Sequence, residues 1–183
     1  MTRLSILTLV MAFILAACTG PIETRVETLV PTALPATKIF SFTEKPEQNN
    51  RLYQDARAMV ASALESKGFS QADSASILVQ IALANRPANI GIDVGENEEK
   101  TPRSVEKKQK FLQSCKDREH RLIVTLTDQI TGSSLYSGIA SEYHCKGTLE
   151  ASLPYLVEAA MADLGSAPHL NIRKRTITRA GLE

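Results

Sequence analysis

The sequence predicts an α+β domain, in which two helices pack on one face of a mixed β-sheet of about four strands. Three patterns predict this class. Apolar residues recur at helical spacing in residues 50–67 and again in 149–164. Two alternating runs, 121–128 and 135–145, flank a short loop that contains Gly132, which is typical of a β-hairpin. The expected order is therefore strand, helix, strand, hairpin, helix.

The elements before the hairpin follow from local patterns. Residues 37–43 alternate and are rich in β-branched and aromatic side chains, which predicts the first strand. The helix over 50–67 ends at Gly68, a residue typical of helix C-caps. Residues 75–84 place aliphatic side chains on one face and predict a second strand, parallel to the first across the helix. The closing helix ends at Gly165.

The hairpin register decides which side chains share a face. If Leu126 lies opposite Leu135, the apolar residues of both strands point to one side of the sheet. In that register His120 and His144 project to opposite faces.

The first residues have the form of a signal peptide. Arg3 precedes an uncharged apolar run that is shorter than the roughly 20 residues of a membrane-spanning helix. The run ends in Leu15-Ala16-Ala17-Cys18, which matches the bacterial lipobox. The box predicts cleavage before Cys18 and acylation of that residue, with palmitate as an expected chain. Thr19 after the acceptor favours sorting to the outer membrane, facing the periplasm.

We therefore expect four segments: a signal peptide (1–17), a lipidated tether (18–36), one α+β domain (37–165) and a basic flexible tail (166–183). The tether is expected because three prolines interrupt 18–36 and no apolar period is sustained there. The tail carries Arg173-Lys174-Arg175, a cluster typical of a solvated terminus or of contact with anionic headgroups.

Charge and composition narrow the function classes. The chain has 21 Lys and Arg against 20 Asp and Glu, and removing the signal peptide takes away only Arg3. A neutral body has no general attraction to polyanions, so we expect no nucleic-acid partner. Aromatic content of 5% with no Trp disfavours a site that stacks bases or sugars.

Besides the acylated Cys18, the mature chain has two cysteines, Cys115 and Cys145, and both lie near the entrance of the predicted hairpin. In an oxidising periplasm this placement favours a structural disulfide. The alternative is a metal site that adds His120 and His144, because two Cys and two His form a zinc-type ligand set. The spacing does not match the usual zinc pairs, so we expect no metal and no cofactor.

A search for catalytic motifs finds no Gly-x-Ser-x-Gly elbow and no phosphate-binding glycine loop. The candidate for a nucleophile and base is the neighbourhood of Cys115, Cys145, His120 and His144, for which the disulfide is a simpler use. The sequence therefore predicts no catalytic residue. The main expectation is a non-enzymatic binding or accessory module of an envelope complex, whose open sheet face needs a cover or a partner. The first alternative is an envelope hydrolase or metal-dependent enzyme with a site near the hairpin end. The second is a carrier of a lipid or small ligand, which would need an apolar cavity between the helices and the sheet.

Several motifs spread along the chain occur together: a lipobox, a lysine-bearing aromatic strand, a helix that closes on a Lys-Gly-Phe step, and a hairpin with a Thr-Gly turn. The residues are Leu15–Cys18, Lys38-Ile39-Phe40, Lys67-Gly68-Phe69, Leu122–Asp128, Thr131-Gly132, Leu135-Tyr136, Gly138 and Ala140. In these motifs residues 36–165 resemble the small Gram-negative lipoproteins grouped as domain of unknown function 4136. The resemblance implies a two-helix, mixed-sheet fold and an envelope location, and it implies no activity. Family members usually carry Trp where this chain has Phe42 and Tyr136, and the cysteine pair is not part of the family pattern.

Overall fold

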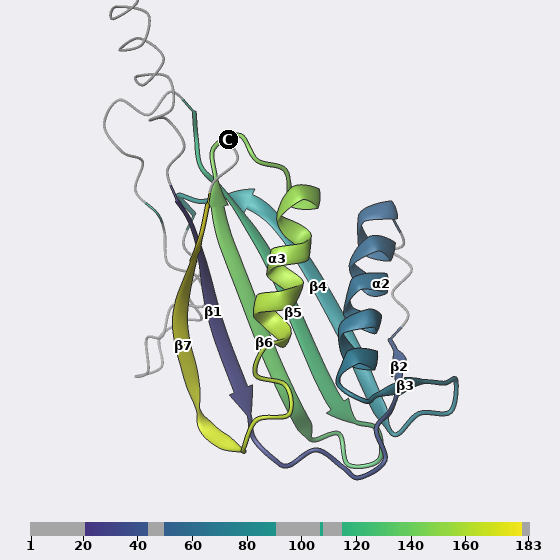
Figure 1. Cartoon of the computed structure of the whole chain (residues 1–183). Coiled ribbons are helices and arrows are strands. Elements are labelled where there is room, and N and C mark those ends of the chain that lie inside the picture. Colours follow the sequence, from purple (N-terminus) through teal and green to yellow (C-terminus); the bar gives the residue numbers. More distant parts are fainter. Residues whose placement is uncertain (1–20, 44–49, 91–106, 108–114, 181–183) are drawn as a thin grey trace, which may run out of the picture.

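The computed structural model describes residues 21–43, 50–90, 107 and 115–180. These residues form one seven-stranded mixed sheet with two helices on one face (Figure 1). The strand order is β3-β2-β4-β5-β6-β1-β7. The elements are β1 (Ile22–Val30), β2 (Ile39–Phe42), α2 (Arg51–Ser66), β3 (Ser70–Gln71), β4 (Ile77–Pro87), β5 (Arg118–Asp128), β6 (Ser134–His144), α3 (Leu149–Met161) and β7 (His169–Arg179).

The expectation of about four strands is wrong, although the α+β class holds. Residues 22–30, expected in the tether, form β1, which lies between β6 and β7. Residues 169–179, expected in the flexible tail, form β7, which pairs antiparallel with β1 along its length. A two-residue strand, β3, adds a parallel partner to β2. The sheet therefore extends past both of the predicted domain boundaries, 37 and 165.

The helices lie close to where the sequence places them. Asn50 caps α2, because its side chain accepts a hydrogen bond from the Tyr53 backbone N–H at 2.9 Å. Gly68 follows α2 with a φ of 82°, which a glycine adopts without strain. Thr148 caps α3 through the Ala151 backbone N–H. No helix in the described ranges is long and apolar enough to cross a membrane.

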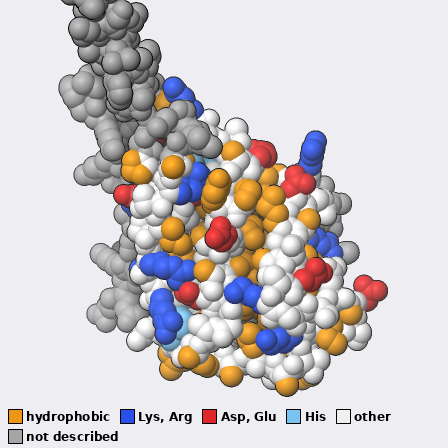
Figure 2. Space-filling view, in the orientation of Figure 1, with side chains coloured by type: hydrophobic (Ala, Val, Ile, Leu, Met, Phe, Trp, Pro, Cys, Tyr) orange, Lys and Arg blue, Asp and Glu red, His pale blue; other side chains and the backbone are white. Residues whose placement is uncertain are grey.

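The core fills the layer between the helices and the sheet. β2 and β4 are parallel neighbours joined through α2, as predicted. Inward side chains of β4, β5 and β6 meet the buried faces of α2 and α3, with Phe40, Leu64, Tyr136 and Leu156 fully buried. Figure 2 shows hydrophobic side chains along the seam between α2 and α3, and Lys and Arg side chains on the β7 side. Burial of this layer is the main stabilising term of the fold.

The hairpin register differs by one residue from the prediction. Leu126 lies opposite Tyr136 rather than Leu135, and a bulge between Leu126 and Thr127 absorbs the difference. Because side chains alternate between faces, this shift moves every β6 residue beyond the bulge to the other face. His120 and His144 consequently point to the same side of the sheet, under α3.

Candidate functional site

A buried polar cluster lies between α3 and the sheet. Its six members come from β1, β5, β6, α3 and β7, and all but the arginine are fully buried: Thr24, His120, Glu142, His144, Ser152 and Arg179. We call this set the polar cluster. Within an otherwise apolar layer, each of these groups needs a hydrogen-bond partner to offset its desolvation.

Glu142 is the centre of the cluster. The Arg179 guanidinium donates to both carboxylate oxygens, from Nε at 3.1 Å and from Nη2 at 2.8 Å. Thr24 Oγ1 donates to Glu142 Oε1 at 2.6 Å, and His144 Nε2 lies 2.8 Å from Oε2. A bidentate arginine with two further donors is the arrangement that makes a buried carboxylate tolerable. Glu142 thus ties β1, β6 and β7 together.

Ser152 connects the two histidines of the cluster. Its hydroxyl lies 3.0 Å from His144 Nε2 and 2.9 Å from His120 Nδ1, and 3.2 Å from the Thr148 carbonyl oxygen, to which it donates. The two imidazole rings stack with centroids 4.8 Å apart and planes 21° apart. His120 Nε2 has no hydrogen-bond partner in the part of the chain that is described.

The surroundings fix the protonation states. Burial alone would raise the pKa of Glu142, but hydrogen bonds from His144, Arg179 and Thr24 lower it to about 2. Burial, assisted by the nearby His144, lowers the pKa of His120 to about 4. At neutral pH the carboxylate is therefore charged and His120 is neutral.

A serine, a histidine and a carboxylate in contact suggest a hydrolytic triad, but the geometry differs from one. An ionised carboxylate only accepts hydrogen bonds. His144 Nε2 must therefore carry a hydrogen and donate a hydrogen bond to Glu142. The same nitrogen faces Ser152, and hence it cannot take the serine proton as a general base would. Ser152 is also 1% exposed. Through its contacts with His120 and His144, Ser152 links α3 to β5 and β6.

The metal alternative also meets an unfavourable geometry. No group of three or more His, Cys, Asp or Glu among the described residues is arranged to hold a metal ion. His120 Nδ1 and His144 Nε2 both face the Ser152 hydroxyl, which occupies the point where a shared metal ion would lie. Cys115 and Cys145 are joined to each other.

The titration of the cluster predicts acid lability. A neutral His120 in the folded state, with a pKa of about 4 against 6.5 when unfolded, contributes stability above pH 6.5 that is lost as the pH falls toward 4. The full loss is about 3 kcal/mol. Urea unfolding across this pH window measures it. His120→Gln should flatten the slope between pH 6.5 and 5, whereas a wild-type stability that is constant in this window contradicts the assignment.

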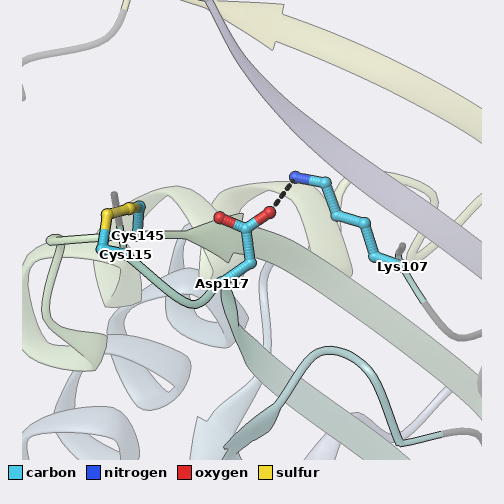
Figure 3. Close-up of a disulfide and its surroundings, with 4 residues drawn as sticks. All are labelled: Lys107, Cys115, Asp117 and Cys145. Carbon is cyan, nitrogen blue, oxygen red and sulfur yellow. Dashed lines mark ion pairs between the residues drawn. A yellow bond between two sulfur atoms is a disulfide. The ribbon is translucent and has the colours of Figure 1, made fainter. Parts of the chain in front are cut away.

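Cys115 and Cys145 form a disulfide with Cα atoms 5.5 Å apart (Figure 3). It closes the open end of the hairpin, just before β5 and just after β6. Beside it Lys107 Nζ makes an ion pair with Asp117 Oδ2 at 2.8 Å. Lys107 belongs to the long connection between β4 and β5, so this pair fixes one point of that connection near the disulfide.

Removing the disulfide should lower stability measurably. The crosslinked residues are 30 apart in sequence, and closing a loop of that size stabilises by about 2–4 kcal/mol. We expect Cys115→Ser/Cys145→Ser, and the reduced wild type, to unfold at the same lower urea concentration. Equal midpoints for the reduced and oxidised wild type, with free thiols demonstrated after reduction, would contradict this.

The structure brings most of the predicted site residues together in two places. Cys115 and Cys145 are joined, and His120 and His144 meet in the polar cluster, while Cys18 lies outside the described residues. Sequence reasoning missed Glu142 and Ser152, along with Thr24 and Arg179. The available signal was alternation, because Glu142 and His144 continue the inward series of Tyr136, Gly138 and Ala140 once the bulge is counted.

No protein-family model matches the chain, and no curated protein matches it. The resemblance to domain of unknown function 4136 thus stays a prediction. Among solved structures, the chain is similar to a PDZ domain protein from Parabacteroides distasonis, with 15% identity and a TM-score of 0.56 over 90% of this chain. The match spans 41% of that protein, which is less than half of its length.

Two weaker matches are a PelC dodecamer from Paraburkholderia phytofirmans and a protein from Caulobacter crescentus described as a lipoprotein. The first has 14% identity and a TM-score of 0.46 over 79% of this chain and 99% of the other. The second has 11% identity and a TM-score of 0.36 over 70% and 85%. At such identities likeness extends to the fold alone, and only the Parabacteroides match is close enough to support it.

Proposed function

We propose that the chain is a lipoprotein, anchored through acylated Cys18 in the outer membrane and facing the periplasm, where it serves as a non-enzymatic binding or accessory module of an envelope complex. The observation that carries the anchor is the run Leu15-Ala16-Ala17-Cys18 directly after an apolar, uncharged segment. Several acyl chains on one residue hold a protein almost permanently, since each buried methylene contributes about 0.8 kcal/mol.

The disulfide supports an oxidising compartment. Structural disulfides form and persist in the periplasm and are rare in the cytosol of most bacteria. The Cys115–Cys145 bridge lies at the surface end of the hairpin, where a reducing cytosol would reach it.

The binding role is supported by the free edge at β7. This strand is 11 residues long, pairs only through its β1 side within the described part of the chain, and exposes Leu170, Ile172 and Ile177. A long uncovered edge is a place where another chain can add a strand. The sheet face that carries no helices is a weaker candidate for a binding surface. Its central aliphatic pair, Ile123 and Ile139, is already half-buried.

The non-enzymatic part is supported by the polar cluster. Ser152 and His144, which resemble catalytic groups, are buried under α3. The His144 nitrogen that faces Ser152 is already hydrogen-bonded to Glu142. We accordingly assign these groups to holding β1, β6, β7 and α3 together.

The anchor is tested by the intact mass of protein extracted from membranes. We expect the mass of residues 18–183 plus acyl chains, and release of Cys115 and Cys145 to alkylation only after reduction. Cys18→Ser should retain the full precursor mass and lose the acyl chains. A wild-type protein of unmodified mass would overturn the anchor. Separation of inner and outer membranes by density then tests the sorting expected from Thr19.

The binding role is tested by site-specific photo-crosslinking in cells. A photoreactive residue at Thr176, in the middle of β7, should give one discrete product of higher mass. The same residue at Glu65, exposed on α2, serves as the matched control. Monomer alone from both positions would count against β7 as a binding edge.

A further inference from the structure

The strand pairing fixes which end of the domain lies near the membrane, provided that Cys18 is acylated as proposed. β1 begins at Ile22, which pairs with Arg179 at the end of β7. β6 ends and β5 begins at this same end of the sheet, where His144 pairs with Arg118 (Figure 1). An extended chain covers at most about 3.6 Å per residue, so Ile22 lies within about 14 Å of the acylated residue. This end must therefore lie close to the membrane.

Three exposed cations lie at this end. Lys116 and Lys146 each directly follow a cysteine of the disulfide, and Arg118 begins β5. We call Lys116, Arg118 and Lys146 the basic rim. The disulfide holds the backbones of its two lysines side by side, because the bridged Cα atoms are 5.5 Å apart.

The rim keeps its charge because the acidic groups beside it are matched by other cations. Asp117 pairs with Lys107, and the buried Glu119 pairs with Arg86. Arg118 itself donates to the side-chain and backbone oxygens of Asn85, which are neutral. No carboxylate among the described residues forms an ion pair with the rim.

Two exposed carboxylates lie at the same end, Glu23 near the start of β1 and Glu150 in the first turn of α3. They are fewer than the cations, because Arg25 is also exposed at this end beside the three rim residues. Its guanidinium carbon lies 4.9 Å from the centroid of the Tyr143 ring. Counted over the described residues, the end nearest the anchor therefore carries an excess of positive charge.

The basic residues of β7, which attract attention in the sequence, are largely used inside the domain. Arg175 pairs with Asp163, and Lys174 with Glu27. Arg179 is held by Glu142. Arg173 is the β7 cation without an ion pair in the described part of the chain, and it lies opposite Thr28, toward the end of β1 that is away from the rim.

We propose that the basic rim binds the anionic headgroups of the membrane that holds the lipid anchor, so that the sheet stands on this end and the hairpin turn lies at the end away from the bilayer. Each Lys or Arg near an anionic surface strengthens attachment by about fivefold. The acyl chains supply the attachment, and the rim sets the orientation.

The test uses the acylated protein extracted from membranes and reconstituted into vesicles of phosphatidylcholine, with or without phosphatidylglycerol. An amine-reactive reagent followed by mass spectrometry measures the labelling rate of each lysine. Lys116 and Lys146 should react about fivefold more slowly on vesicles that contain phosphatidylglycerol. High salt should remove the difference, because it screens the headgroup charge. Lys67 follows the C-terminal end of α2, at the end of the domain away from the rim, and should react equally fast on both kinds of vesicle.

A variant makes the charge dependence specific. In Lys116→Gln/Arg118→Gln the protection of Lys146 should fall, whereas Lys67→Gln should leave it unchanged. Equal labelling on both kinds of vesicle overturns the rim proposal while the anchor stands, because proximity alone would not depend on lipid charge. An unacylated mass overturns the anchor first, and the rim proposal with it.

Discussion

Glu142→Gln is expected to lower the free energy of unfolding by about 3 kcal/mol, the largest effect of any single replacement in the polar cluster. Gln keeps the size of the side chain but removes its charge, so the Arg179 guanidinium loses both charge-assisted bonds. Breaking a buried ion pair costs about 3–5 kcal/mol. We expect the lower value here because the Arg179 side chain is 19% exposed and stays partly hydrated. Urea unfolding at pH 7 measures the change.

A double-mutant cycle separates the pair from the rest of the cluster. Arg179→Gln alone leaves a buried carboxylate with two donors, Thr24 and His144, and should also destabilise. If Glu142 and Arg179 act as a pair, the double variant should lose less than the sum of the two single variants. Glu158→Gln, exposed on the outer side of α3, is the matched control and should change stability by less than about 0.5 kcal/mol. Strict additivity at Glu142 and Arg179 would contradict the proposed coupling.

The central part of the fold was predictable because its patterns are local. The amphipathic stripe of α2 and the Gly68 stop are visible in the sequence, and the structure has them within a residue or two. The alternation of β5 and β6 likewise predicts a hairpin. These elements bury apolar faces, which is the property that periodicity detects.

The two strands that were missed bury a different kind of face. Thr24 and Thr28 are inward residues of β1, and each donates to a carboxylate that a β7 arginine also binds. The second of these carboxylates, Asp163, pairs with Arg175 just as Glu142 pairs with Arg179. In β1 the inward threonines alternate with Ile22, Val26 and Val30, which weakens the apolar pattern, and in β7 the inward arginines remove it. The two segments therefore look like a tether and a tail. Thr24 and Thr28 are each more than 100 residues away in sequence from the carboxylate that they bind. A local pattern cannot reveal such a partner.

The polar cluster was missed for a related reason. A register inferred from aligning apolar residues has no means of locating a bulge, and one extra residue moved His144 to the other face of the hairpin. The two histidines stand out in the sequence, but Glu142 and Ser152 gain their meaning only when α3 lies over the sheet. The hairpin turn, by contrast, lies where Thr131 and Gly132 predicted it, with Gly132 at a φ of 69°.

Gly138→Ala should be strongly destabilising, by about 3 kcal/mol or more, because α3 lies directly on this residue. A Cβ added to Gly138 would lie 2.0 Å from the Ala160 carbonyl oxygen and 2.8 Å from the Tyr136 hydroxyl. That carbonyl also accepts the hydrogen bond of the buried Tyr136 hydroxyl. Since the first clash is with helix backbone, no change of rotamer relieves it, and α3 must move away from β6.

The backbone clash gives this prediction two controls. Gly132→Ala has open space around its Cβ but a φ of 69°, so it should lose only about 1–2 kcal/mol through backbone strain. Adding Tyr136→Phe to Gly138→Ala removes the hydroxyl contact and leaves the contact with the Ala160 oxygen, so it should not restore stability. Urea unfolding of the three variants ranks them. If Gly138→Ala loses no more stability than Gly132→Ala, then α3 does not pack on β6 as closely as described. Ser152 and Glu142 would then be less tightly covered by α3 than the proposed non-enzymatic role requires.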